Sequence, residues 1–511
     1  MTTRDATIVS RDEEMGRYRT LRIGPGEAWI ARRLDGSVTA LPEGEAILAL
    51  VHLSDTHVMD AQSPARVEFL DRFIDLEAND EGRTYRPQEV LTTQVLDAMA
   101  RAVAAATRAP FSGRALDIAL LTGDATDSAQ ANELQWLADV LDGGVVTPDS
   151  GDPARYEGVG SPQWPDPSYW HPGVPSPAGY PVVPGFHDAA RREFTARGMP
   201  VPWLAVYGNH DGLVQGTLPP SDATSAHAVG GMKALAAADG ADPRAARDLL
   251  DGVIDERTLA VLVDAPSVAV TPDERRRHLS RAEHIAWHLE RGGHGLTESN
   301  RATGTAYYRR DLGEIDLVVL DTVNEHGGWQ GSLDAPQLEW LRGQLADADT
   351  GHRAVLVASH HTSADLVNDQ RPVGAPARVL CEEVLAELHR HPSVIGWLNG
   401  HTHATRITAH PGPSGGFWEV TAPSLIDWPQ QARIVEVLRT SEGYALVTTM
   451  LDHAAPAAWP VSLPDSVSLA ALSRELAANS WGVPRESVPD PQTHPRRGTL
   501  LDRNAVLLVP R

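Results

Sequence analysis

The feature that most constrains the fold is a set of short apolar segments that recur along the chain, each closed by turn residues. They are rich in Val, Leu, Ile and Ala, and they span 46–54, 116–122, 203–207, 317–320, 354–358 and 394–398. Such runs are typical of buried strands in a sheet. Apolar residues recur at helical spacing between them, in 92–108, 131–141 and 336–346. Strands that alternate with helices predict a layered α/β fold.

The rest of the chain extends this pattern and interrupts it twice. Three further strands are predicted at 417–421, 434–439 and 444–451, and the tail carries a short helical pattern at 469–476 and an apolar end at 505–509. Segment 143–199 holds ten prolines between Pro148 and Pro184 together with several aromatic residues, which excludes regular structure. Segment 221–300 has a helical pattern, with capping boxes expected at Thr271 and Ser280. We therefore expect an N-terminal extension at 1–45, a catalytic domain at 46–455 with insertions 143–199 and 221–300, and a C-terminal extension at 456–511.

Composition narrows the class of protein. The chain has 511 residues and no apolar run that approaches the ~20 residues of a membrane helix, so no membrane association is expected. The net charge of −24 argues against binding a nucleic-acid backbone. The single cysteine, Cys381, allows no intrachain disulfide, and the first 16 residues have no apolar signal region, so a cytoplasmic protein is expected. Lys233 is the only lysine, and no role follows from that alone.

Polar residues that can bind metal close five of the apolar runs. In chain order they are Asp55, His57, Asp124, Asn209, His360, His401 and His403. The carboxyl ends of strands are where open α/β sheets bind ligands. In the Asp-x-His and His-x-His pairs, alternation along an extended segment places both side chains on one side, within reach of one metal region. Imidazole, carboxylate and amide oxygen together suit Mn, Fe or Zn.

The number of these residues predicts two metal ions. One tetrahedral metal rarely takes more than about four ligands, and this chain offers seven. Two metals that share a carboxylate use all seven and leave positions for water. Such a pair, about 3.5–4 Å apart, can clamp the attacking and leaving oxygens of a displacement at phosphorus.

The order of the motifs resembles that of the calcineurin-like metallophosphoesterase superfamily. The blocks are Asp-x-His at 55–57, Gly-Asp-x-x-Asp at 123–127, Gly-Asn-His-Asp at 208–211, His360, and Gly-His-x-His at 400–403. The resemblance spans roughly residues 46 to 451 and leaves the two insertions uncovered. It implies a β-sandwich flanked by helices and a binuclear metal centre.

The resemblance also implies a role for each residue. One metal would be held by Asp55, His57 and His403, and the other by Asn209, His360 and His401. Asp124 would bridge them together with a water or hydroxide. His210 would protonate the leaving oxygen, and Asp127 would orient His210.

Other interpretations of some of these residues stay open. Asp127 also suits the N-cap of the helix at 131–141, or a solvated loop. His361 is expected to line the site beside His360 rather than to bind metal. The i, i+4 pair His284 and His288 lacks the glutamate of a zinc HExxH motif, so a solvated helix face is expected there.

The sequence therefore predicts a binuclear, metal-dependent phosphoric ester hydrolase, a phosphomonoesterase or phosphodiesterase acting on a small-molecule phosphoester. The strand end at 319–322 and the Gln-Leu-Glu-Trp-Leu segment at 337–341 are similar to the phosphodiesterase and purple-acid-phosphatase-like branches, although Asp127 stands where the purple enzymes carry their iron-binding tyrosine. One alternative is a specific cyclic-nucleotide or glycerophosphodiester phosphodiesterase, and another is a catalytically silent binding scaffold of the same fold. Insertion 143–199 is expected to form a wall or lid at the metals, or else a crust on the scaffold or a dimer contact.

Overall fold

The computed structural model describes residues 1–11, 18–73, 84–176, 179–237, 240–250, 252–253, 255–261, 265–413, 415–480 and 491–511. Parts of both predicted insertions and of the C-terminal extension lie outside the described residues. Within the described ranges, no helix combines the length and the apolar character needed to span a membrane.

Two large sheets form the centre of the molecule. The eight-stranded sheet has the order β4-β3-β20-β19-β18-β5-β6-β9. Its strands are β3 (Ile30–Arg32), β4 (Val38–Thr39), β5 (Glu45–Leu53), β6 (Ile118–Leu121), β9 (Trp203–Ala205), β18 (Gln431–Thr440), β19 (Gly443–Asp452) and β20 (Ala505–Pro510). The six-stranded sheet has the order β12-β13-β14-β15-β17-β16. Its strands are β12 (Tyr308–Asp311), β13 (Ile315–Val319), β14 (Ala354–Ala358), β15 (Val394–Asn399), β16 (Arg406–Gly412) and β17 (Gly415–Thr421).

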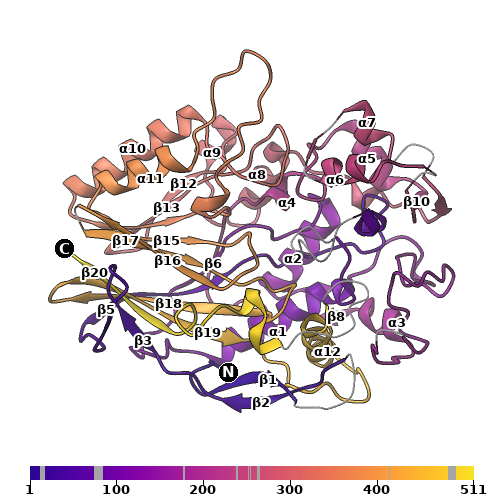
Figure 1. The fold of residues 1–511 in the computed structure, drawn as a ribbon, viewed down its shortest axis with the longest axis horizontal. Helices are drawn as coiled ribbons and strands as arrows, with labels where there is room; N and C mark the ends of the chain where they lie inside the picture. Colours follow the sequence, from indigo (N-terminus) through magenta and orange to yellow (C-terminus); the bar gives the residue numbers. More distant parts are fainter. Residues whose placement is uncertain are drawn as a thin grey trace.

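The two sheets pack face to face and carry helices on their outer faces. Side chains of both sheets, such as Leu50, Leu120, Leu356 and Leu398, share one buried cluster. Helices α10 (Ala335–Thr350) and α11 (Cys381–Arg390) cover the six-stranded sheet, while α1 (Thr92–Ala105), α2 (Ala131–Asp142) and α12 (Ser466–Ala478) pack on the other. Figure 1 shows the two strand layers, with α10 and α11 on one side. The predicted layered β-sandwich flanked by helices is confirmed, and every predicted strand forms.

Both terminal segments contribute to the eight-stranded sheet. The final strand, β20, pairs antiparallel with β19 and parallel with β3, so residues from the two ends of the chain lie side by side. A separate hairpin, β1 (Ala6–Ser10) and β2 (Leu21–Pro25), precedes them. The segments that we expected to be extensions therefore add strands to the central sheet, while the division into domains stays a prediction.

Insertion 143–199 packs on α12. It contains only short elements among its described residues, namely β7 (Val145–Val146), α3 (Phe186–Ala190) and β8 (Phe194–Thr195). Trp170 and Phe186 share a buried cluster with Leu469 and Leu472 of α12. The insertion is therefore held to α12 by the packing of its aromatic side chains rather than by long helices or strands of its own.

Insertion 221–300 carries several short helices, as its sequence pattern indicated, together with an antiparallel pair of strands. Its elements are α5 (Asp222–Val229), β10 (Met232–Ala234), α6 (Pro243–Leu250), α7 (Glu256–Leu259), β11 (Ser267–Ala269), α8 (Arg281–Leu289) and α9 (Glu298–Thr303). Ser280 caps α8 as expected, because its hydroxyl accepts from the amide of Glu283. The cap expected at Thr271 is wrong, since the 3-10 helix there starts after Asp273, whose carboxylate accepts from the next amide but one. Asp273 directly precedes the turn and supplies the cap in place of Thr271.

Candidate metal centre

The carboxyl ends of β5, β6, β14 and β15 bring six of the seven predicted ligands together. Potential ligand atoms of Asp55, His57 and His403 lie within 4.8 Å of one another, as do those of Asp55, Asp124 and His360. A third group with the same spacing joins His360 and His401 with the neighbouring His361.

Asn209 offers the seventh ligand atom. It opens the short helix α4 (Asn209–Gly212) after β9, and its side-chain amide donates to the carbonyl of Gly216 at 3.0 Å. Its side-chain oxygen is buried and has no hydrogen-bond partner among the described residues. The next residue, His210, donates its backbone N–H to Asp124 at 2.8 Å, which places this segment against the cluster. An orphaned buried amide oxygen costs free energy unless a donor or a cation meets it.

The ligand-bearing turns hold an unusual backbone conformation. Five predicted ligands have left-handed φ angles: Asp55 (51°), His57 (42°), Asp124 (47°), His401 (68°) and His403 (54°). Such angles cost of order 1–3 kcal/mol for residues other than glycine and cluster at functional sites. The extended Asp-x-His and His-x-His segments that we expected are therefore wrong. Side chains converge because the backbone curls at the strand ends, and not because they alternate along a strand.

Hydrogen bonds around the cluster fix the tautomers of three histidines. Nδ1 of His57 lies 3.1 Å from the Asp127 carboxylate, Nδ1 of His403 lies 2.6 Å from Asp427, and Nδ1 of His360 lies 2.8 Å from the carbonyl of Thr122. These oxygens only accept, so each Nδ1 donates and each Nε2 is left to face the centre of the cluster. Partners of this kind orient the histidines of metal sites.

The inward-facing atoms have no donor among themselves. Nε2 of His57 lies 3.1 Å from Nε2 of His403, and Nε2 of His360 lies 3.1 Å from a carboxylate oxygen of Asp124. Acceptors packed this closely need positive charge between them. When no cation is bound, a proton on His360 supplies this charge. Burial lowers the pKa of His360, but the carboxylate of Asp124 outweighs burial and raises that pKa to about 9. A metal cation would displace such protons, so the donor set fits transition-metal ions.

The centre has a strongly charged surrounding shell that the sequence did not reveal. Asp427, which holds His403, is bound by Arg86 at 2.8 Å and by Arg496 at 2.6 Å. Burial raises the pKa of Asp427, but Arg496 and Arg86 outweigh it and hold that pKa well below its usual range. Asp427 therefore stays a carboxylate that accepts from His403. Its position in an irregular loop gave no motif from which to predict it.

His210 lies at the accessible edge of the cluster, with 23% of its side chain exposed. Its Nδ1 donates to the backbone carbonyl of Asp127 at 2.6 Å, whereas the Asp127 carboxylate is 3.9 Å away. Asp127 thus contacts His210 through its backbone, and its side chain binds His57 and Arg66 instead. The alternative N-cap role of Asp127 is wrong, since Gln130 precedes α2. A Cβ at Gly216 would lie 2.4 Å from Nε2 of His210, so glycine is needed there.

His361 lines the centre without an available nitrogen. Its Nδ1 lies 2.7 Å from the hydroxyl of Thr322 and its Nε2 lies 2.9 Å from the carbonyl of Trp329. The Trp329 ring is partly exposed and stacks on His401, with 5.7 Å between the ring centroids. Trp329 therefore gives the centre a flat aromatic wall that the sequence analysis missed.

His284 and His288 lie away from the centre and are not solvated. They are 5% and 1% exposed, and Nε2 of one lies 3.0 Å from Nε2 of the other. His288 continues the chain to His294, which stacks on Trp203 of β9. The predicted solvated face is wrong because these imidazoles satisfy one another inside the protein.

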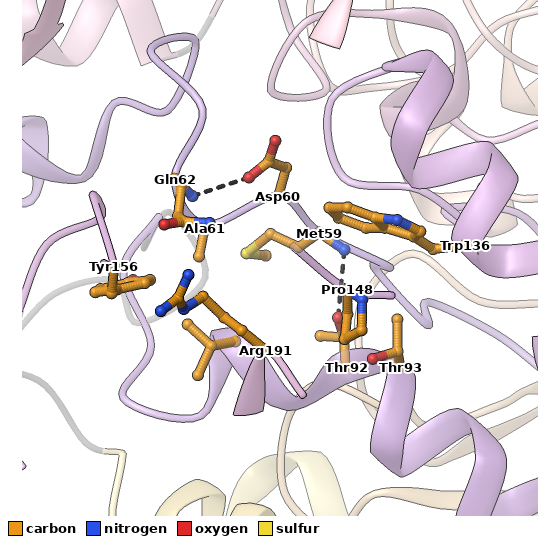
Figure 2. Close-up of a pocket in the computed structure, with 11 residues that line it drawn as sticks. Met59, Asp60, Ala61, Gln62, Thr92, Thr93, Trp136, Pro148, Tyr156 and Arg191 are labelled. Atoms are coloured by element: carbon orange, nitrogen blue, oxygen red, sulfur yellow. Dashed lines mark hydrogen bonds between the residues drawn. The ribbon is translucent and has the colours of Figure 1, made fainter. Parts of the chain in front are cut away.

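The contacts of insertion 143–199 place it beside the loop that follows the first ligand pair. Figure 2 shows Pro148, Tyr156 and Arg191 around a small cavity that is also lined by Asp60 and Gln62. The described contacts of the insertion thus reach the segment after His57, and the proposed lid stays a prediction.

Comparison with known proteins adds distant relatives. No protein-family model matches the chain. A manganese-dependent ADP-ribose/CDP-alcohol diphosphatase from Xenopus laevis is 28% identical over 113 residues, which are 20% of this chain and 28% of the relative. The enzyme of the same name from Xenopus tropicalis is 30% identical over 108 residues, 20% of this chain and 29% of the relative. The chain thus spans less than a third of the length of these curated relatives. Their names agree with the metal-dependent phosphoester chemistry that the motifs indicate.

Two solved structures also resemble this one loosely. A dimetal phosphatase from Danio rerio has a TM-score of 0.36 and 14% identity, covering 80% of this chain and 97% of its own. A calcineurin-like phosphoesterase from Bacillus subtilis has a TM-score of 0.25 and 8% identity, covering 80% of this chain and 91% of its own.

Proposed function

We propose that this protein is a metal-dependent phosphoric ester hydrolase whose centre holds two transition-metal ions. The observation that carries the proposal is the pair of inward-facing nitrogens of His57 and His403, 3.1 Å apart, each with its other nitrogen committed to a carboxylate. That arrangement is unfavourable for neutral imidazoles and favourable around a cation.

The positions of the side chains support a division into two sets of ligands. Asp55, His57 and His403 form one close group, and a nitrogen of His360 lies 3.2 Å from one of His401 in the other. We assign the unpartnered side-chain oxygen of Asn209 to this second set. A single oxygen of Asp124, Oδ2, lies 3.1 Å from Nε2 of His360 and 3.8 Å from Nε2 of His57. Asp124 therefore faces both sets, as a shared ligand must.

The reaction needs an acid for the leaving group, and His210 is placed to supply it. Metal ions bound here would stabilise charge on the phosphoryl oxygens and make a water-derived nucleophile available near neutral pH. His210 keeps its Nδ1 proton on the Asp127 carbonyl, so in the imidazolium form its Nε2 carries the proton that we assign to the departing oxygen. Gly216 packs closely against the His210 ring, and its lack of a side chain leaves room for that ring.

The curated relatives provide the first substrates to test. Their names specify ADP-ribose and CDP-alcohols, and we propose that this chain likewise hydrolyses a small-molecule phosphodiester or diphosphate. The Trp329 ring, stacked on His401, offers a flat surface for an aromatic part of such a substrate. The cytoplasmic location expected from the sequence stays a prediction.

A product-release screen of the purified protein with added manganese tests this function. The panel compares nitrophenyl phosphate, bis-nitrophenyl phosphate, ADP-ribose and a CDP-alcohol, with and without EDTA. Hydrolysis of at least one phosphodiester or diphosphate that EDTA abolishes is the expected result. No turnover of any member by a protein that retains its metals would favour the silent scaffold instead.

A further inference from the structure

The only lysine of the chain occupies a fully buried position in the second insertion. Lys233 lies in β10, and its side chain has no solvent exposure. Its ammonium donates to the carbonyl of Ser63 at 2.8 Å and to both carboxylate oxygens of Glu68 at 3.1 and 3.2 Å. Burying an ammonium group costs free energy unless the group is paired with a carboxylate and fully hydrogen-bonded, and Lys233 meets both conditions.

A continuous chain of buried charges leads from Lys233 to a predicted metal ligand. The Glu68 carboxylate also lies 3.5 Å from Nε of Arg66. The terminal nitrogens of Arg66 bind Asp127 at 2.5 Å and Glu89 at 3.0 Å. The other oxygen of Asp127 accepts from Nδ1 of His57. All the side chains of this network are at most 3% exposed.

Lys233 influences the contact between Arg66 and Asp127 because two carboxylates, Glu68 and Asp127, compete for the Arg66 guanidinium. Glu68 and Asp127 both face the Arg66 guanidinium, and screening by water is weak at this depth. Because Lys233 binds both oxygens of Glu68, Arg66 keeps its closest contact with Asp127. Without the ammonium, Glu68 becomes a buried carboxylate whose nearest cation is Arg66, and the guanidinium is drawn away from Asp127.

The insertion also anchors the segment that carries these groups. Apolar side chains of α6 and β10, among them Ala234 and Leu249, pack on Phe69 and Leu70 of the 3-10 helix Glu68–Phe73. The insertion therefore contacts the surroundings of the metal centre through both an apolar cluster and one charge.

We propose that Lys233 is a positioning residue for the metal centre. It neutralises Glu68, so that Arg66 stays on Asp127 and Asp127 holds the imidazole of His57 toward the metal. The inference rests on the proposed metal centre but not on any particular substrate.

Manganese affinity, measured by titration calorimetry and by electron paramagnetic resonance of the free ion, tests the inference without using activity. Changes to outer-shell partners of metal ligands typically weaken affinity about 10–100-fold. Lys233 acts through Glu68 and Arg66 on Asp127, which is the outer-shell partner of His57. K233M should therefore weaken one of the two manganese sites by about 10-fold, the lower end of that range. The double variant K233M/E68Q removes both charges. Its manganese affinity should return to within about threefold of the wild-type value, because a neutral residue 68 no longer attracts the Arg66 guanidinium away from Asp127.

A matched control separates positioning from general stability. Arg474 is another fully buried cation, but it donates to backbone carbonyls of His453, Ala455 and Pro456 rather than to the network. R474M should lower Tm and leave manganese affinity unchanged. Should K233M fail to fold, E68Q alone must bind manganese at least as tightly as wild type.

Several results would overturn the inference. They are wild-type affinity in K233M, a K233M/E68Q variant as weak as K233M, or weakened binding in E68Q. A wild-type protein that binds no metal would overturn the metal centre itself, and this inference with it, whereas two bound metals without turnover would count against the proposed activity alone.

Discussion

Replacing Asp427 with asparagine should weaken metal binding without changing any ligand. Asp427 accepts from Nδ1 of His403 at 2.6 Å and is fixed by Arg86 and Arg496. Asparagine keeps the size of the side chain but removes the charge that pairs with the arginines and turns one acceptor into a donor. His403 then loses the partner that sets its tautomer and ring orientation.

The size of the effect follows from the position of Asp427 directly behind a ligand. Loss of such a partner typically costs about 10–100-fold in metal affinity, which is about 1.4–2.7 kcal/mol at 25 °C. We expect D427N to lose this amount at one manganese site and to keep the other near its wild-type affinity. Calorimetric titration with manganese, fitted to two sites, measures both.

Asp316 provides a matched control for this variant. It is a buried carboxylate on β13 held by two arginines, Arg309 at 2.6 Å and Arg353 at 2.7 Å, and it contacts no predicted ligand among the described residues. D316N should therefore lower Tm as D427N does but leave both manganese sites unchanged. Equal manganese affinity in D427N and wild type, or an equal loss in D316N, would refute the reasoning.

Three further predictions concern the acid, the buried histidines and the first insertion. H210A should lower kcat by about 10²–10⁴-fold with the metals retained, and by less for nitrophenyl esters, because a good leaving group needs less protonation; equal losses across leaving groups in steady-state assays would exclude the acid role. Burial lowers the pKa of His284 to about 3 from about 6.5, so its contribution to stability is complete above pH 6.5 and is lost as the pH falls toward 3. Thermal unfolding between pH 7 and 4 should therefore show a steep fall in Tm that H284Q makes shallower, and an unchanged slope would count against this. Replacing residues 161–185 with a short Gly-Ser linker should alter the ratio of kcat/KM between small and bulky esters if the insertion forms a lid, whereas an unchanged ratio in a folded, metal-loaded variant would exclude the lid.

The strands and the residues expected to bind metal were predictable because each is indicated by a short stretch of sequence. An apolar run that ends in Asp, His or Asn marks both a buried strand and a side chain at its carboxyl end, as at Asp55 after β5 and His360 after β14. The order of such ends along the chain then indicated the chemistry.

The surrounding shell was not predictable because it depends on contacts between distant segments. Arg66 and Asp427 lie in irregular segments with no motif, and only the folded chain brings Arg66 to Asp127 and Asp427 to His403. The same limit applies to His284 and His288, since spacing alone does not distinguish a solvated imidazole from one that another imidazole satisfies. Left-handed φ angles at five ligands likewise follow from tertiary constraints and not from residue type, because non-glycine residues disfavour them.

The most direct test of the metal centre is an anomalous difference map from crystals of the protein grown with manganese. The account predicts two peaks that share Asp124 as a ligand, one next to His57 and His403 and the other next to His360 and His401. A single peak in a fully active protein, or no peak among these residues, would contradict the binuclear centre.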